Sequence, residues 1–135
     1  MFSPETHYLA GVALLTIVTI EFGGWFLSRV VRGAVPMTDF QKSFARAGHA
    51  HAGVLVILGL VCLLYTDATA LTGAWLWIAR IGVLAAAVLM SAGFFLSSIG
   101  RDVTRPNKLI ALLWLGALSL AAGVLTLGIG LLASA

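Results

Sequence analysis

Three ionisable side chains, Glu21, His49 and His51, lie in stretches of sequence that are otherwise apolar enough to dissolve in lipid. A charged side chain at the centre of a bilayer costs about 2.5–3.5 kcal/mol on insertion scales, and such residues usually serve a function. A carboxylate beside imidazoles is able to bind a divalent metal ion, relay protons or act as an acid–base pair. Glu21 and His49 are therefore the candidate catalytic residues.

Basic residues that flank these stretches indicate how deep the three side chains lie. Glu21 precedes Arg29 by eight residues, which places it ~12 Å from the basic loop at a helical rise of about 1.5 Å per residue. His49 and His51 follow Arg46 by three and five residues, or roughly 4–8 Å. The three side chains are therefore expected to share one layer of the membrane and to form a single site.

Other residues fall in the same layer, among them Met90, Ser91 and Trp114. Arg46 lies one helical turn before His49 and suits an anionic group such as a propionate or a phosphate. A thioether beside imidazole favours a soft metal ion such as copper(I). The candidate metal ligands are Glu21, His49, His51 and Met90, and a cofactor is expected to contact His49, His51, Arg46 and Trp114.

The two histidines are separated by one residue. Positions 49 and 51 of a regular helix point about 200° apart, so both side chains cannot reach one metal ion. One histidine is expected to face Glu21 and the bundle core, and the other a different helix pair or a neighbouring subunit. The residues beside them are small (GHAHAG), which leaves room for a flat macrocycle or for a closely packed helix.

The composition indicates which elements must position these residues. The chain has 135 residues, of which 61% are hydrophobic and 10% charged, whereas a soluble domain is about 25% charged. Four apolar stretches reach the ~20 residues that span a bilayer. We expect helices at about 8–28, 47–66, 74–98 and 108–132, and hence an all-α integral membrane four-helix bundle that forms one domain over residues 1–135.

Basic residues concentrate in the first and third connecting loops, and the loop over residues 67–73 has none. The positive-inside rule makes the two basic loops cytoplasmic and puts both termini outside. The expected location is therefore the bacterial inner membrane, with the candidate site in the cytoplasmic leaflet. The bilayer is the expected partner, and no nucleic-acid partner is expected, because the net charge of +3 is explained by these loops.

The two halves of the sequence look alike. Residues 24–28 (GWFLS) resemble residues 93–97 (GFFLS), and residues 52–55 match residues 122–125 (AGVL), with offsets of 69 and 70. This pattern predicts two duplicated helical hairpins related by a pseudo-two-fold axis along the membrane normal. In the second half, Gly116, Gly123 and Gly130 recur at heptad spacing, which predicts close helix packing.

Residues 46–53 (RAGHAHAG) open an apolar helix. This segment resembles the haem-ligating helix of the haem–copper oxidase superfamily, and the resemblance implies that His49 or His51 is an axial ligand of haem b. The chain as a whole resembles small bacterial four-helix integral membrane proteins of unassigned function.

These features leave several functions open. The first hypothesis is a membrane-embedded protein that binds haem b or a transition metal ion for a redox-type role, as a homo-oligomer or in a larger membrane complex. A proton-coupled small transporter or channel would use Glu21 as the carrier and the histidines as a relay. An accessory or scaffold subunit is a third hypothesis, and an enzyme with Glu21 and His49 as an acid–base pair is a fourth.

Overall fold

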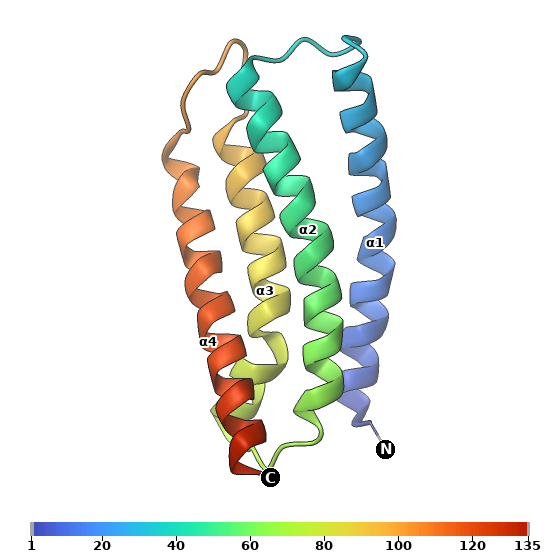
Figure 1. Ribbon diagram of the computed structural model, residues 1–135, viewed down its shortest axis with the longest axis vertical. Coiled ribbons are helices and arrows are strands. Elements are labelled where there is room, and N and C mark those ends of the chain that lie inside the picture. Colours follow the sequence, from blue (N-terminus) through green and yellow to red (C-terminus); the bar gives the residue numbers. More distant parts are fainter. Residues whose placement is uncertain (1, 135) are drawn as a thin grey trace.

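The computed structural model describes residues 2–134 as four long α-helices joined by short loops. They are α1 (Pro4–Val31), α2 (Asp39–Thr66), α3 (Gly73–Ser97) and α4 (Ala111–Ala133), with a 3₁₀ turn, η1 (Lys108–Ile110), before α4. The helices run alternately up and down, and both ends of the chain lie at the same end of the bundle (Figure 1). This arrangement confirms the all-α four-helix bundle expected from the sequence.

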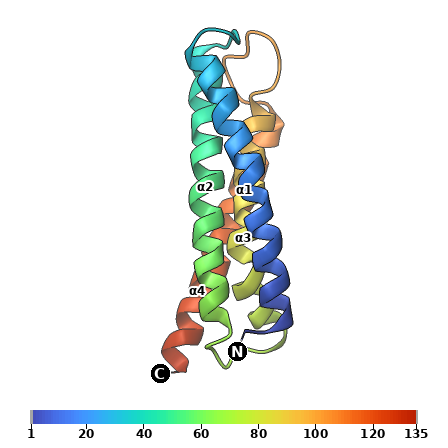
Figure 2. The ribbon, with the colours of Figure 1, turned by 90° about the vertical axis from the view of Figure 1, so that its right-hand side faces the viewer.

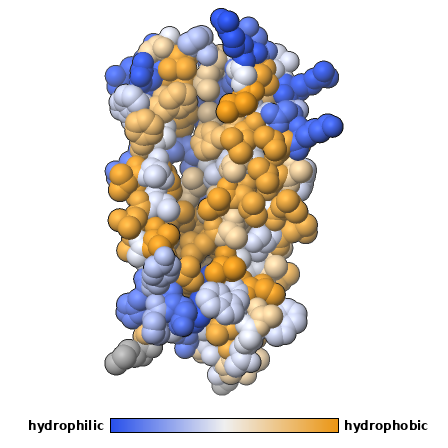
Figure 3. Space-filling model, turned by 180° about the vertical axis from the view of Figure 1, so that it is seen from behind, coloured by the Kyte–Doolittle hydropathy of each residue, from blue (hydrophilic) through white to orange (hydrophobic). Residues whose placement is uncertain are grey.

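All four helices are long and apolar enough to cross a membrane, which makes the chain a multi-pass membrane protein by length and composition. An apolar middle separates hydrophilic ends on the face shown in Figure 3. The bilayer, rather than a large internal core, therefore covers much of the apolar surface.

The helix boundaries differ from the expected ones most clearly in α2, which begins at Asp39 rather than near residue 47. The cause is a capping box: the Thr38 hydroxyl accepts a hydrogen bond from the Gln41 amide (3.1 Å), and the Gln41 side chain accepts one from the Thr38 amide (3.1 Å). Such reciprocal bonds satisfy the free amides of a first turn. Arg46 therefore lies inside α2 rather than at its start, and His49 lies ten residues into the helix.

Glycines bring α3 and α4 into close contact. A Cβ atom on Gly82 would lie 2.7 Å from the Cα atom of Gly123, and one on Gly116 would lie 2.5 Å from the Cγ atom of Met90. The Ser119 hydroxyl donates a hydrogen bond of 2.8 Å to the Gly82 carbonyl oxygen across the same interface. The close packing expected from the glycine spacing is confirmed, and small residues explain it because they let helix backbones approach.

In contrast to α3, α1 is held loosely. Only 6% of the residues in its most apolar window are buried, against 50% in α3. Within residues 2–134 it packs mainly against α2, and the two helices diverge toward the N-terminal end of α1 in the view of Figure 2. The hairpin of α1 and α2 is thus packed less tightly than the hairpin of α3 and α4, and the duplication suggested by the sequence stays a prediction.

One end of α1 is fixed by an ion-pair network. The Arg80 guanidinium donates to the Asp67 carboxylate (2.8 Å) and to the Ser3 hydroxyl (3.1 Å), and the Ser3 amide donates to Asp67 (2.8 Å). Burial acts to raise the pKa of Asp67, but hydrogen bonds from Ser3, Thr6 and Arg80 outweigh it and hold that pKa below its usual range. The network ties the start of α1 to the end of α2 and to α3.

Candidate functional site

A crevice of about 500 Å³ lies between α1 and α3, with α2 along its third side. Its volume falls within the range of small-molecule and cofactor sites, about 300–1,000 Å³. Val12 and Val88 line it and are 45% and 68% exposed, so the crevice opens to the outer surface of the bundle. In a membrane that surface faces lipid, and a ligand in this crevice would enter from the bilayer.

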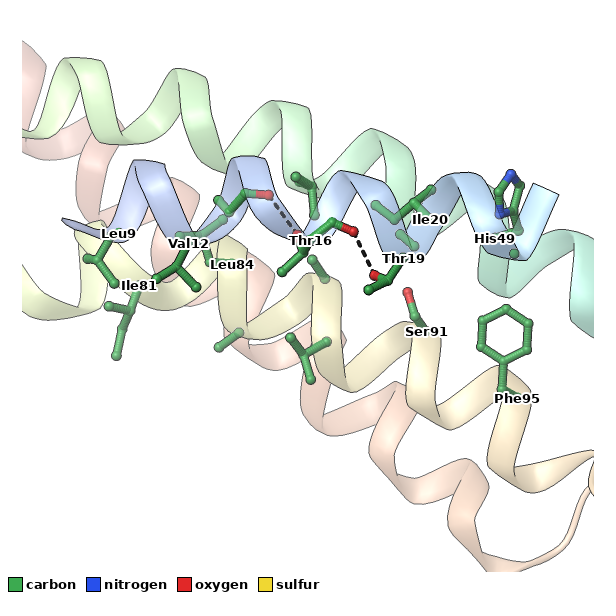
Figure 4. A pocket seen from close by; sticks show the side chains of 17 residues that line it. Leu9, Val12, Thr16, Thr19, Ile20, His49, Ile81, Leu84, Ser91 and Phe95 are labelled. Carbon is green, nitrogen blue, oxygen red and sulfur yellow. Dashed lines mark hydrogen bonds between the residues drawn. The ribbon is translucent and has the colours of Figure 1, made fainter. Parts of the chain in front are cut away.

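The crevice is polar at one end and apolar at the other (Figure 4). His49, Ser91 and Thr19 lie at one end, close to the ring of Phe95. Leu9 and Ile81 line the opposite end, with apolar neighbours from α1 and α3. The site is therefore suited to an elongated ligand with one polar end.

His49 enters the crevice because α1 has two glycines opposite it. A Cβ atom on Gly23 would lie 3.2 Å from Nδ1 of His49, and one on Gly24 would lie 3.5 Å from Nε2. Among residues 2–134, no hydrogen bond to the His49 ring is found. Both ring nitrogens are therefore free to bind a ligand atom, one as donor and one as acceptor in the neutral ring.

Ser91 carries a buried hydroxyl without a partner. The residue is 9% exposed, and within the described chain its Oγ atom makes no hydrogen bond. The neighbouring hydroxyls differ: Thr16 donates to the Ala13 carbonyl oxygen (2.7 Å) and Thr19 to the Thr16 carbonyl oxygen (2.6 Å). A buried polar group without a hydrogen-bond partner lowers the stability of the folded protein by about 1–3 kcal/mol, so such groups are rare and often bind a ligand or water. The sequence placed Ser91 in the right layer but gave no sign of its role.

His51 faces a different helix. Its ring packs on Phe94 of α3 with ring centroids 5.0 Å apart, and its Nδ1 lies 2.8 Å from the Ala47 carbonyl oxygen. The two histidines thus contact different helices, as expected from their separation along α2. The bond to Ala47 requires a proton on Nδ1 and leaves Nε2 as an acceptor, the tautomer that metal-ligating histidines commonly have.

The remaining candidate residues are not brought together within this chain. Glu21 is exposed on α1 and does not line the crevice. The ion pairs among residues 2–134 are Lys42–Asp39 and Arg80–Asp67, so Glu21 has no cationic partner there. In the same range no group of three His, Cys, Asp or Glu side chains is placed to hold a metal ion.

Met90, Trp114 and Arg46 do not line the crevice that His49 enters. Met90 is 8% exposed and fills the space opposite Gly116, while Trp114 is 66% exposed on the outside of α4. Arg46 lines a separate pocket of about 300 Å³ beneath the loop between α1 and α2. The shared layer stays a prediction, and within residues 2–134 these three side chains lie on other parts of the bundle than the crevice.

The positions of these residues can be compared with those that the haem b implied by the sequence resemblance would need. One histidine ligand is present, and the crevice at His49 has room beside it. A second axial ligand from Met90 does not fit, because that side chain is packed between α3 and α4. Arg46, the expected partner of the haem propionates, lines the other pocket. The chain alone therefore fits haem incompletely.

No protein-family model matches this chain, and comparison with curated proteins and with solved structures gave no match. Its class is defined by its fold and crevice: a multi-pass four-helix membrane bundle with a ligand-sized crevice open to the outer surface of the bundle.

Proposed function

We propose that this protein binds a lipophilic cofactor or substrate, which enters the crevice between α1 and α3 from the bilayer, with His49 as a polar contact. The observation that carries the proposal is a largely apolar crevice of about 500 Å³ into which the His49 imidazole projects, without a hydrogen-bond partner in the described part of the chain. Convergent polar groups in a largely apolar pocket are typical of small-molecule sites. The proposal includes the redox-type role expected from the sequence, which the bound cofactor would carry out.

The proposal includes an orientation in the membrane. The two loops between α1 and α2 and between α3 and α4 lie at the same end of the bundle (Figure 1). These loops and the helix ends beside them carry seven of the eight basic residues. The positive-inside rule would make this end cytoplasmic in a bacterial inner membrane, with both termini outside. His49 would then lie in the cytoplasmic leaflet, and the ion pair of Asp67 and Arg80 would lie near the outer surface.

The test uses the full chain purified in a mild detergent. Absorption spectra are recorded before and after reduction with dithionite, and a solvent extract is examined by mass spectrometry. We expect a lipophilic molecule to co-purify with the wild-type protein. We expect His49→Ala to lose most of it, and His51→Ala, the matched control two residues away, to retain it.

Each outcome separates the cofactor classes. A Soret band that shifts on reduction and disappears in His49→Ala would make haem b the ligand, and metal analysis of the same samples would reveal a bound transition metal ion. A colourless extract that contains a lipid-soluble molecule would support a non-haem ligand. An empty wild-type protein that also fails to bind added lipophiles would contradict the proposal.

A second proposal concerns association, and the exposure of α1 favours it. Glu21 is exposed on this helix, as are Phe22 (65%) and Trp25 (52%). A carboxylate facing hydrocarbon is unfavourable, and membrane proteins usually turn such groups toward a partner. We propose that a second copy or a larger membrane complex covers this face. Such an assembly is compatible with an accessory role for the protein and with a role for Glu21 in proton transfer. Crosslinking of a Phe22→Cys variant, with Val88→Cys as a control, would test whether two copies meet at this face of α1.

A further inference from the structure

We infer that the ligand of the α1–α3 crevice is a neutral amphiphile whose head group bears a carbonyl oxygen, with that oxygen held by Ser91 and His49 and its apolar tail directed toward Leu9. This inference rests on the proposed function and adds the chemistry and the orientation of the ligand. The juxtaposition that carries it is a buried hydroxyl, without a partner among residues 2–134, at one end of a largely apolar crevice.

Ser91 indicates a hydrogen-bond acceptor. A serine inside a helix ordinarily donates to a carbonyl oxygen of the preceding turn, as Thr16 and Thr19 do here. The Ser91 hydroxyl makes no such bond among the described residues, although the residue is 9% exposed, and in Figure 4 its oxygen points toward the α1 side of the crevice. A ligand oxygen at this place would receive a bond that the protein leaves unmade.

The walls of the crevice indicate a tail. Along α1 the lining runs from Leu9 to Gly23, a distance of ~21 Å for fourteen steps of about 1.5 Å. Away from Ser91 and His49 the walls are largely aliphatic, with Leu84 and Ile81 on α3. A compact polar molecule would leave most of this length empty, whereas an alkyl or isoprenoid chain would fill it.

The charges indicate that the head group is neutral. Of the residues that the structure describes, no Lys, Arg, Asp or Glu lines the crevice. Arg80 is paired with Asp67, and Arg46 lines a different pocket. A carboxylate or phosphate placed at Ser91 would be buried without a fixed cation, which is far less favourable than burying a hydrogen-bonded carbonyl group. Membrane quinones and neutral acyl esters share the inferred chemistry.

The experiment measures equilibrium binding to the full chain in lipid nanodiscs. The probes are a decyl-substituted benzoquinone, monopalmitoylglycerol and palmitate, which represent a quinone, a neutral ester and a charged acyl chain. We expect at least one neutral probe to bind more tightly than palmitate. We expect Ser91→Ala to weaken that binding about 3- to 10-fold, as for the loss of one hydrogen bond.

Stability measurements separate a ligand role from a structural one. The hydroxyl of Ser91 has no partner among residues 2–134, so Ser91→Ala is expected to leave the melting temperature of the ligand-free protein unchanged or raised. Ser119 is the matched control because its hydroxyl bonds to Gly82 across the α3–α4 interface. Ser119→Ala is expected to lower the melting temperature and to leave the affinity for the probe unchanged.

The outcomes distinguish this inference from the proposed function. Tighter binding of palmitate, or binding of a neutral probe that Ser91→Ala does not weaken, would overturn the inferred head group while leaving a lipophile in the crevice. Failure of all three probes, with a different lipophile found in the extract, would have the same meaning. Failure of the probes together with an empty extract would overturn both. The tighter of the two neutral probes identifies the source of the carbonyl group.

Discussion

The imidazole of His49 lies against Gly23 of α1, so closely that a Cβ atom at position 23 would be 3.2 Å from Nδ1. This contact defines the polar end of the crevice, because the absence of a side chain on α1 leaves a recess for the ring. A single methyl group at this place would have to move the ring by a few tenths of an ångström. The contact therefore connects the position of His49 directly to the sequence of α1.

Gly23→Ala is expected to reduce retention of the bound lipophile several-fold by displacing the His49 ring. Helix propensity favours alanine over glycine by about 1 kcal/mol, so the protein itself is expected to remain stable. Gly11→Ala is the control, since a Cβ atom at Gly11 has no neighbour within 4 Å. Ligand content per protein, measured in solvent extracts, compares the two variants, and equal loss in both would contradict the role given to the recess.

Ala85→Leu is expected to fill the crevice. Ala85 lines it from α3 and is partly exposed, so a larger side chain would occupy ligand space. We expect the bound lipophile to be lost. We expect the melting temperature of the ligand-free protein to be unchanged or raised, because apolar contacts made in previously empty space stabilise the folded protein. Ala121→Leu makes the same change on the exposed face of α4. Retention of ligand by Ala85→Leu would place the ligand elsewhere.

Gly82→Ala is expected to destabilise the bundle by about 1–3 kcal/mol, the usual effect of overpacking. The new Cβ atom would lie 2.7 Å from the Cα atom of Gly123, and backbone cannot give way as a flexible side chain does. Gly128→Ala on the same helix pair meets nothing within 4 Å. Thermal unfolding in detergent would show a lower midpoint for the first variant, and equal midpoints would argue against the close α3–α4 contact.

The Asp67 network predicts a loss of stability in acid. The pKa of Asp67 is lowered in the folded protein, so its contribution is fully present above the unfolded-state pKa of about 3.9 and is lost as the pH falls through the folded-state value. Arg80→Ala should lower stability by about 1.5–3 kcal/mol, as for a charge-assisted hydrogen bond, because the Asp67 carboxylate then keeps only its hydrogen bonds from Ser3. The exposed pair of Asp39 and Lys42 is the control, and Asp39→Asn should change stability by less than about 1 kcal/mol. Melting curves between pH 3 and pH 7 would decide, and an Asp67→Asn variant with an unaltered acid response would contradict the assignment.

Hydropathy was sufficient to predict the four helices, because about twenty apolar residues define a span whatever its neighbours are. It failed at the start of α2, since the hydrogen bonds between Thr38 and Gln41 extend the helix through a polar segment. The candidate site was harder to predict. Counting residues gives depth along a helix, but the rotation of each helix is set by packing, and the fit of Met90 opposite Gly116 directs it away from His49. The unpaired hydroxyl of Ser91 depends on three-dimensional neighbours and has no signature in sequence.

The helix α1 is anchored by different physics at its start and at Gly23, about two turns before its end. At Ser3 the anchor is electrostatic, a carboxylate and a guanidinium joined through a hydroxyl and an amide. At Gly23 the anchor is steric, a recess matched to an imidazole ring. Acid weakens the first anchor and a larger side chain at position 23 disturbs the second, so the two anchors of α1 are controlled independently, and neither change acts on the glycine contact that joins α3 to α4.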